Sequence, residues 1–215
     1  MSTAREDILQ RIRTALPGDP QNPAHSHAGI ARHYDRTGTL SRRDCLELFI
    51  DRLVDYDTEI IQLDDEAGLP TAIASALQQD QEERIIVAPE FPAAWLPAAI
   101  HIIVDNDLST AAINHAQAVI TTCEAAVAST GTIFLVHQGT QGRRVITLLP
   151  DHHICLVRRD QVVELIPEAL TAIAAKAALP ITTISGPSAT SDIEMTRIRG
   201  VHGPRRLTVI LYGTN

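Results

Sequence analysis

The chain has 215 residues, with 18 Lys and Arg side chains against 26 Asp and Glu, a formal net charge of -8 at pH 7 and 45% hydrophobic residues. A chain of this length buries roughly 70% of the surface that its unfolded form exposes, so it can build a core without disulfides or a structural metal. The excess of acidic residues argues against a nucleic-acid-binding protein, because binding phosphates requires clustered Lys and Arg.

Cysteine usage and hydropathy indicate the compartment. The three cysteines, Cys45, Cys123 and Cys155, are widely spaced and form no C-x-x-C pair, so we expect reduced thiols and no metal site. The N-terminus lacks the apolar region of a secretory signal, and no window approaches the roughly 18 consecutive apolar residues of a membrane span. The sequence therefore predicts a cytoplasmic protein without a membrane span.

The N-terminal part differs from the rest of the chain. Apolar residues at helical spacing predict an amphipathic helix over residues 3–16, which ends at Pro17-Gly18. Residues 17–39 are rich in Pro, Gly, His and Asn and predict a long loop or flexible arm, whose histidines we interpret as exposed loop residues. We therefore divide the chain into an N-terminal helix and arm, residues 1–39, and one domain, residues 40–215.

From Ser41 onward, helical and strand patterns alternate. A long helix begins after Ser41, with Asp44 three residues on, and helical segments follow near residues 70–78 and 91–96. Short apolar runs between them predict strands over residues 59–63, 84–88 and 100–104. This alternation is typical of β-α-β units and a largely parallel sheet.

The second half contains closely spaced strand patterns and one longer helix. Asp107 to Ser109 predict the cap of a short helix, and an Ala-rich helix is expected from about Val162 to Ala178. Strands are expected over residues 117–120, 131–136, 144–149, 153–157, 181–184 and 207–212, the last two closing the sheet. The predicted fold class is α/β, a single domain with a mixed, largely parallel sheet flanked by helices.

Residues 121–132 are the first segment whose composition suggests chemistry. A strand runs into small and hydroxyl residues, and small residues at the carboxyl end of a strand let a ligand approach the backbone. Glu124 is the candidate reactive group, and Thr130, Gly131 and Thr132 are candidate substrate-binding or anion-binding residues. The alternative is that Thr-Gly-Thr forms only a tight turn.

Residues 186–194 are the second such segment. Ser191 and Glu194 have the spacing of a capping box, which predicts a helix that begins near Asp192. The N-terminus of a helix can bind an anion, so Ser188, Thr190 and Asp192 are candidate binding residues. The alternative is a well-capped helix without a ligand, because Asp192 would also repel an anion.

The third segment surrounds His202, which lies between two glycines and is followed by Arg205. Histidine titrates near neutral pH, so His202 is a candidate general acid or base. Arg205 is a candidate for binding a carboxylate, since a guanidinium can form two parallel hydrogen bonds to it. The alternative is a structural loop histidine.

Four motifs in this order resemble the LUD domain, the lactate-utilisation protein C family: A-S-T-G-T-I, L-L-P-D-H-H-I-C-L-V, S-G-P-S-A-T-S-D-I-E and G-V-H-G-P-R-R-L-T-V-I-L. The resemblance covers roughly residues 40–213. Ser129 stands where many members have Glu, which shifts attention to Glu124.

The resemblance implies a fold similar to the CoA-transferase and ribose-5-phosphate-isomerase group. It also implies a role in oxidising L-lactate to pyruvate as one of three proteins. Members with cysteine-rich repeats hold iron-sulfur clusters, and this chain lacks such repeats. We therefore expect a cluster-free subunit with no cofactor of its own, whose partners are iron-sulfur proteins and a small 2-hydroxy acid.

As a working hypothesis, one pocket contains the residues of all three segments, with Arg205 binding a carboxylate and His202 transferring a proton. Two other classes stay open. The chain can be a non-catalytic binding or assembly module of the same system, or, by analogy of fold alone, a small-molecule transferase or isomerase acting on CoA or a sugar phosphate.

Overall fold

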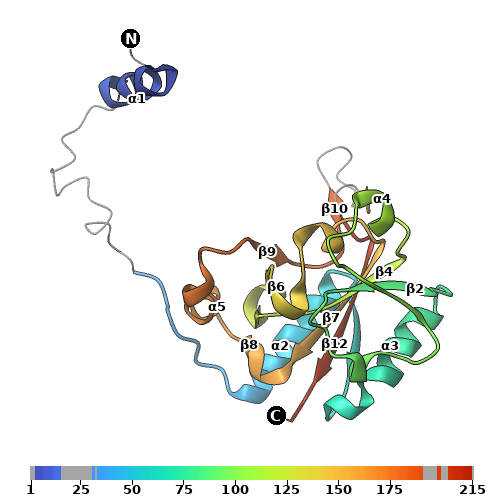
Figure 1. Cartoon of the computed structure of the whole chain (residues 1–215). Helices are drawn as coiled ribbons and strands as arrows, with labels where there is room; N and C mark the ends of the chain where they lie inside the picture. The colour runs from blue at the N-terminus through green and yellow to red at the C-terminus, as the bar shows by residue number, and fades with distance from the viewer. Residues whose placement is uncertain (1–2, 16–30, 32, 191–197, 200–202, 215) are drawn as a thin grey trace. The chain divides into compact units, whose positions relative to one another are not determined.

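The computed structural model describes residues 3–15, 31, 33–190, 198–199 and 203–214, and it divides the chain into two compact units, residues 1–34 and 35–215 (Figure 1). The first unit contains α1 (Ala4–Ala15), so the predicted N-terminal helix is confirmed. None of its residues is buried, and its apolar side chains Ile8, Leu9 and Ile12 are all exposed. The predicted boundary after residue 39 lies inside the second unit.

A six-stranded sheet with strand order β1-β12-β7-β4-β2-β3 forms the centre of the second unit, and all of its pairings are parallel. The largely parallel sheet is thus confirmed. β12 lies between β1 and β7, so it does not close the sheet as we expected. The strands are β1 (Glu59–Gln62), β2 (Arg84–Val87), β3 (His101–Val104), β4 (Ala118–Thr122), β7 (His152–Arg158) and β12 (Arg206–Tyr212).

Helices cover both faces of this sheet, which explains why its central strands contain buried apolar residues on both faces. α2 (Arg42–Asp55) begins at Ser41, whose hydroxyl accepts a hydrogen bond from the Asp44 backbone N–H. Its buried Phe49 and Leu53 pack with Cys155, Val157 and other residues of one face. α3 (Leu69–Gln78) packs with the alternate residues of the same strands on the other face.

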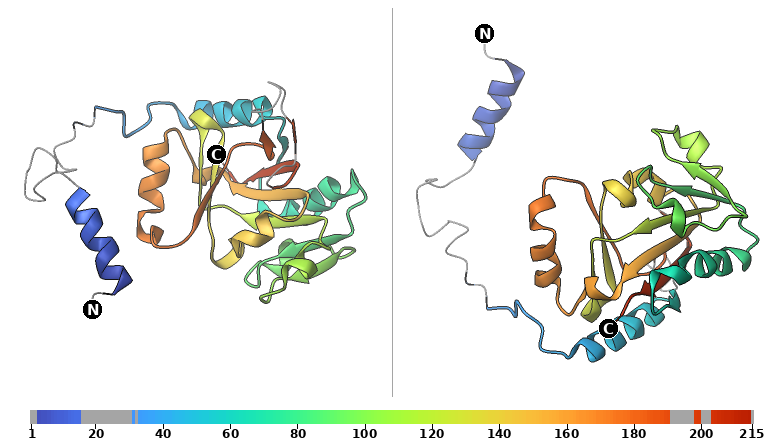
Figure 2. Two further views of the ribbon diagram at one scale, coloured as in Figure 1. Left: turned by 90° about the horizontal axis from the view of Figure 1, so that it is seen from above. Right: turned by 60° about the horizontal axis from the view of Figure 1, so that its bottom comes forward.

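A second sheet, with order β8-β5-β6-β9, lies beside the first and was not expected. Its strands are β5 (Ala125–Val127), β6 (Thr132–Val136), β8 (Val162–Val163) and β9 (Ile181–Ile184). β5 and β6 form an antiparallel hairpin, whose connection passes through Gly131 at φ 60°. One face of this second sheet packs on α5 (Ile166–Ala172). The other face belongs to the hydrophobic cluster that contains Phe49 and Leu53 of α2. In both views of Figure 2, α5 and α3 lie at opposite sides of the second unit.

The strand predicted over residues 144–149 is wrong. These residues form a 3-10 helix, η7 (Arg144–Thr147), in which Ile146 is fully buried in a cluster with Ile86 and Val119. A short apolar run has the same pattern in a buried strand and in a buried helical turn, so periodicity alone does not separate them. The run is apolar because one side of the turn covers the sheet.

The Ala-rich helix predicted over residues 162–178 is also wrong in its extent. Val162 and Val163 form β8, which pairs with β5, and α5 starts only at Ile166 with Pro167 in its first turn. Proline suits the first turn of a helix but removes a donor further inside. A further 3-10 turn, η9 (Ala174–Lys176), follows α5. The helical segment expected over residues 91–96 is only the 3-10 turn η4 (Ala93–Trp95).

Two short elements complete the fold. α4 (Thr110–Ile113) is capped by the Ser109 hydroxyl, as predicted. β10 (Ala189–Thr190) and β11 (Ile198–Arg199) form a two-stranded antiparallel ribbon. The helix predicted to begin near Asp192 lies outside the described residues. In the described part of the chain, no helix combines the length and the apolar character that crossing a bilayer requires.

Candidate functional site

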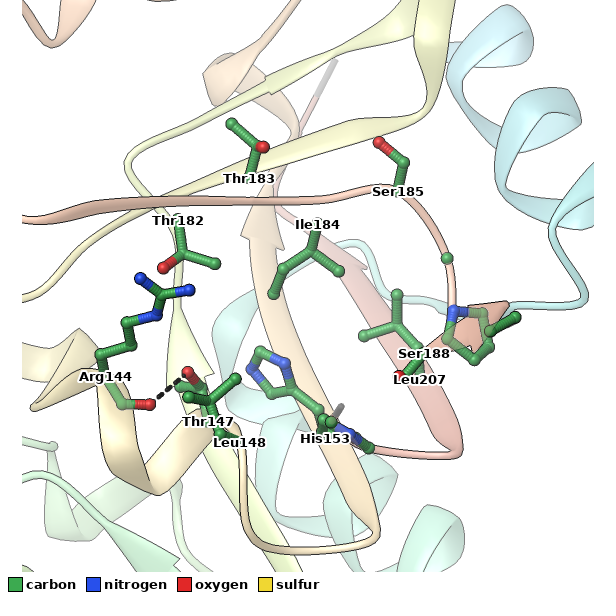
Figure 3. A pocket seen from close by; sticks show the side chains of 15 residues that line it. Arg144, Thr147, Leu148, His153, Thr182, Thr183, Ile184, Ser185, Ser188 and Leu207 are labelled. Carbon is green, nitrogen blue, oxygen red and sulfur yellow. Dashed lines mark hydrogen bonds between the residues drawn. The ribbon is translucent and has the colours of Figure 1, made fainter. Parts of the chain in front are cut away.

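A cavity of about 340 Å³ lies between the two sheets, at the amino-terminal ends of β7 and β12 (Figure 3). One wall is formed by β9 and the loop that follows it, and the other by η7 and the first residues of β7 and β12. Its size is at the lower end of the range for small-molecule sites, roughly 300–1,000 Å³. The polar side chains that line it are Arg144, Thr147, His153, Thr182, Thr183, Ser185 and Ser188.

Arg144 is the cation of this cavity. Its side chain is exposed, and within the described residues its guanidinium has no hydrogen bond or ion pair. The neighbouring Arg143 differs, because it donates two hydrogen bonds to the buried Asp105 and holds the pKa of that carboxyl below its usual range. Arg143 is therefore a structural residue, whereas the guanidinium of Arg144 has no such partner among the described residues.

Thr182 presents a hydroxyl on the opposite wall. Its Oγ1 lies 2.7 Å from Nε2 of His137, which directly follows β6, and Nδ1 of the same ring lies 3.2 Å from the carbonyl oxygen of Gly142. Burial lowers the pKa of His137, the hydrogen bond to Gly142 opposes this change, and the charge of Arg144 adds to the lowering. The ring is therefore neutral at pH 7.

His153 reaches the cavity from the start of β7 and is almost completely buried. Its Nε2 lies 2.8 Å from the hydroxyl of Thr121. Burial, with a contribution from His152 and His137, lowers the pKa of His153 to about 3. This imidazole is therefore also neutral, and the only cation among the described lining residues at neutral pH is Arg144.

Of the predicted site residues, Ser188 lines this cavity together with Gly203 and Pro204 of the third segment. The backbone N–H of Ser188 donates to the carbonyl oxygen of Pro204 over 2.8 Å, so the second and third segments meet here. His202 and Asp192 lie outside the described residues. Of Thr190 only the backbone is described, in β10.

The Thr-Gly-Thr segment reaches the cavity indirectly. The hydroxyl of Thr130 lies 2.7 Å from that of Thr132, which lies 2.9 Å from the hydroxyl of Ser185 in the cavity wall. Thr130 itself lines a different depression of about 410 Å³ beside α2. Gly131 has the left-handed conformation of a tight turn, and an added Cβ would lie 3.0 Å from Cβ of Arg52. This segment therefore supports the wall.

Glu124 is bound on both of its carboxylate oxygens. Lys176 donates to Oε1 over 2.7 Å, and the amide of Gln141 donates to Oε2 over 3.4 Å. Glu124 is not among the residues that line the cavity of Arg144. Its carboxylate joins the loop after β4 to η9.

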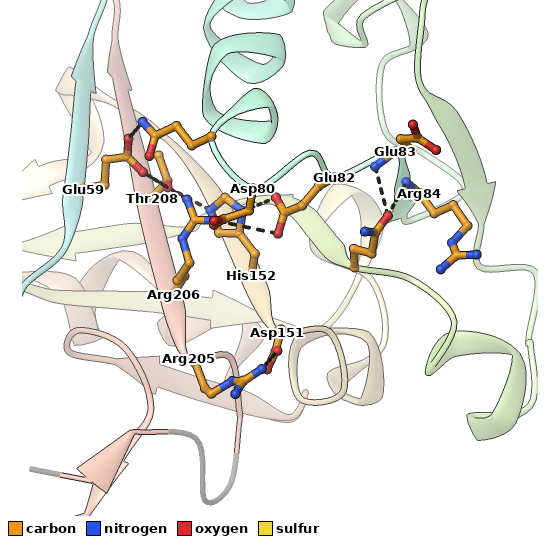
Figure 4. A network of polar contacts seen from close by, with 12 residues as sticks. Glu59, Asp80, Glu82, Glu83, Arg84, Asp151, His152, Arg205, Arg206 and Thr208 are labelled. Carbon is orange, nitrogen blue, oxygen red and sulfur yellow. Dashed lines mark hydrogen bonds and ion pairs between the residues drawn. The ribbon is translucent and has the colours of Figure 1, made fainter.

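Arg205 lies in another cavity, of about 610 Å³, at the amino-terminal ends of β2, β4, β7 and β12. It forms an ion pair with Asp151, with its Nε 2.8 Å from Oδ1. The surrounding side chains form a network of hydrogen bonds and ion pairs, in which His152 contacts Glu82 and Thr208 (Figure 4). Arg206 pairs with Asp80 in the same network. The predicted binding residues thus line three different cavities, and the donors of Arg205 face a carboxylate of the chain itself.

Sequence reasoning did not single out His137 or Thr182. They are 45 positions apart, and the strand patterns around each give no sign that they meet. Arg144 was not among the predicted site residues either. Among the described residues, no group of three or more His, Cys, Asp or Glu side chains is placed to hold a metal ion.

Comparison with known proteins places this geometry in a family. A profile of the LUD domain matches residues 49–212. The chain belongs to the LUD domain family. A relative from Deinococcus radiodurans named lactate utilization protein C is 45% identical over 213 residues, which cover 98% of this chain and 96% of the relative. A protein of the same name from Exiguobacterium is 28% identical over 97% of this chain and 96% of its own length.

A solved structure supports the fold of this LUD domain. The crystal structure of a DUF162 family protein from Deinococcus radiodurans superimposes with a TM-score of 0.72 and 42% sequence identity, covering 81% of this chain and all of that one (100%). The mixed α/β architecture with a largely parallel central sheet is therefore shared with that protein.

Proposed function

We propose that the chain acts in the use of L-lactate as a carbon source, as the cluster-free subunit of a three-protein system that oxidises L-lactate to pyruvate. The relatives that match almost the full length of the chain carry the name lactate utilization protein C, which supports a role in lactate utilisation. The three-protein arrangement comes from the family resemblance.

The proposal assigns the iron-sulfur clusters to partner proteins. All three cysteines of this chain are buried. The hydrogen bond to Cys155 and burial raise the pKa of the Cys123 thiol, and burial raises that of Cys45. Cluster ligands are thiolates, and a thiol with a raised pKa keeps its proton at neutral pH. Cys45 and Cys123 are therefore poorly suited to bind iron.

The observation that carries the proposal at the level of the site is Arg144, which has no partner among the described residues and faces hydroxyl groups across a small cavity. A guanidinium binds a carboxylate through two parallel hydrogen bonds. We assign the carboxylate to Arg144 in place of Arg205, because Arg205 already binds the carboxylate of Asp151 through its Nε and Nη2.

The test is growth of a strain that lacks only this gene, on L-lactate and on pyruvate as the carbon source. Growth should fail on lactate, continue on pyruvate and recover when the intact gene is restored. Normal growth of the deletion strain on lactate would contradict the proposed role.

Variants of the cavity separate a substrate-binding subunit from an assembly module. Restoring the gene with Arg144→Gln should fail to rescue growth on lactate while the partner proteins still co-purify. Arg43→Gln is the matched control, since Arg43 makes an exposed pair with Glu47 on α2, and it should rescue growth. Full rescue by Arg144→Gln would show that the cavity is not the site.

A further inference from the structure

The hydrogen bonds around His137 determine which of its nitrogens carries the proton. The carbonyl oxygen of Gly142 can only accept a hydrogen bond, so Nδ1, 3.2 Å away, must donate. A neutral imidazole has one N–H, so Nε2 is an acceptor. His137 is therefore the Nδ1–H tautomer, oriented by the backbone of the loop after β6.

The tautomer of His137 in turn orients the hydroxyl of Thr182. Since Nε2 only accepts, the Thr182 hydroxyl donates its single proton to it over 2.7 Å. A threonine hydroxyl has one donor and two acceptor positions. The cavity therefore meets an oxygen atom of Thr182 that can accept a hydrogen bond but has no proton left to donate.

Arg144 and Thr182 line the same cavity and offer opposite polarity to a ligand. Figure 3 draws both side chains at one end of it, with His153 facing them from β7. A ligand that satisfies both groups has an anionic group for Arg144 and a hydrogen-bond donor for Thr182.

We propose that the cavity selects small carboxylates that carry a hydroxyl group over the corresponding oxo acids, with Arg144 binding the carboxylate and Thr182 accepting the hydrogen bond of the ligand hydroxyl. This inference rests on the proposed function and names the ligand class and the residues that discriminate. An oxo group offers only an acceptor, so it would face the lone pairs of Thr182. A ligand without oxygen at that carbon would leave this acceptor unsatisfied.

The binding test compares three ligands that share the carboxylate. L-lactate, pyruvate and propionate are titrated into the full-length protein at neutral pH, with NMR chemical shifts or calorimetry as the readout. L-lactate should bind about 3- to 10-fold more tightly than propionate, the range that one hydrogen bond to a neutral group supplies, and pyruvate should bind more weakly than L-lactate. Equal affinity for lactate and propionate would overturn the inference.

Variants assign the discrimination to individual side chains. Thr182→Val should remove the preference for lactate over propionate, whereas Thr182→Ser should keep it. Thr171→Val makes the same chemical change on the exposed side of α5 and should leave the preference intact. Arg144→Gln should lower the affinity for all three ligands by a similar factor. A Thr182→Val protein that still prefers lactate would overturn the role of Thr182.

Nitrogen-15 NMR of the imidazole rings provides a test that needs no folded variant of Thr182. His137 should give the signature of the Nδ1–H tautomer, with an unprotonated Nε2. A protonated Nε2 would reverse the direction of the hydrogen bond and overturn the inference. Failure of all three ligands to bind at millimolar concentration would also overturn it. The growth experiment tests the proposed function separately, because its result does not depend on this binding measurement.

Discussion

At the scale of single residues, the buried histidines have the clearest physical consequences. His153, the second residue of β7, is a polar residue among buried apolar side chains, and the hydroxyl of Thr121 is its hydrogen-bond partner. Burial lowers its pKa from 6.5 to about 3, because the apolar surroundings disfavour the charged imidazolium. The folded protein keeps this ring neutral, whereas the unfolded chain protonates it near its ordinary pKa.

This difference makes stability depend on pH. Between about pH 3 and 6.5, His153 is protonated in the unfolded state but neutral in the folded state. The free energy of unfolding therefore falls as the pH decreases below 6.5. When the pH falls from about 7.5 to about 5.5, His153 alone should lower the free energy of unfolding by about 1.4 kcal/mol. His137 acts in the same direction, because burial also lowers its pKa.

Urea unfolding at the two pH values measures the effect. The loss of stability on acidification should be smaller in His153→Gln than in the unchanged protein by about 1.4 kcal/mol, since glutamine does not titrate. Thr171→Gln, a change at an exposed position that removes no titratable group, should leave the pH dependence unaltered. An equal loss in the His153 variant and the unchanged protein would show that folded His153 accepts a proton above pH 5.5.

At the scale of elements, the connection between β5 and β6 joins the second sheet to α2. Gly131 adopts φ 60° in this connection, and an added Cβ would lie 3.0 Å from Cβ and 3.2 Å from the backbone carbon of Arg52. The backbone of a helix cannot move aside at low cost. The position therefore requires glycine both for its conformation and for the close approach.

Two glycine variants separate these causes. Gly139 has a similar φ of 53°, but its added Cβ would meet only Oε2 of Glu90 at 3.7 Å. Gly139→Ala should lower the free energy of unfolding by about 1 kcal/mol through backbone strain, and Gly131→Ala by about 2–3 kcal/mol because the contact with α2 adds to the strain. Chemical denaturation measures both. Equal losses would show that α2 shifts to accept the methyl group.

Local signals predicted elements well where the decisive contacts are local. Ser41 and Ser109 cap helices because their hydroxyls bind backbone N–H groups three residues on, and this spacing is visible in the sequence. The run Arg144–Thr147 has strand-like composition, yet no neighbouring strand pairs with it and it coils over the sheet. Val162 and Val163 look helical beside the alanines that follow, but pairing with β5 makes them a strand.

At the scale of the whole molecule, the chain consists of two units with unequal cores. Residues 35–215 contain both sheets and all of the buried hydrophobic residues in the described part of the chain. The unit of residues 1–34 contains α1, which buries none of its side chains. The stability of the second unit should therefore come from its own residues.

Truncation tests this division. A protein of residues 35–215 should fold and unfold cooperatively with a melting temperature within a few degrees of the full chain, because α1 itself contributes no buried side chain. Removal of residues 1–53 is the contrasting variant, since it deletes Phe49 and Leu53 of the α2 core and should abolish folding. A large fall in melting temperature of the shorter truncation would show that the domain depends on residues 1–34.

The sequence by itself determined the α/β class, the parallel sheet, the N-terminal helix and the family, because these follow from hydrophobic periodicity, local caps and motifs that lie within a few residues of one another. It also suggested Ser188 as a binding residue, and in the structure this residue lines the cavity of Arg144. Only the tertiary structure decided which arginines form ion pairs within the chain and which one does not in its described part. Asp151 forms an ion pair with Arg205, and Asp105 forms one with Arg143. Arg144 instead lines the same cavity as Thr182. Such pairings depend on contacts between segments distant along the chain, which no local pattern encodes.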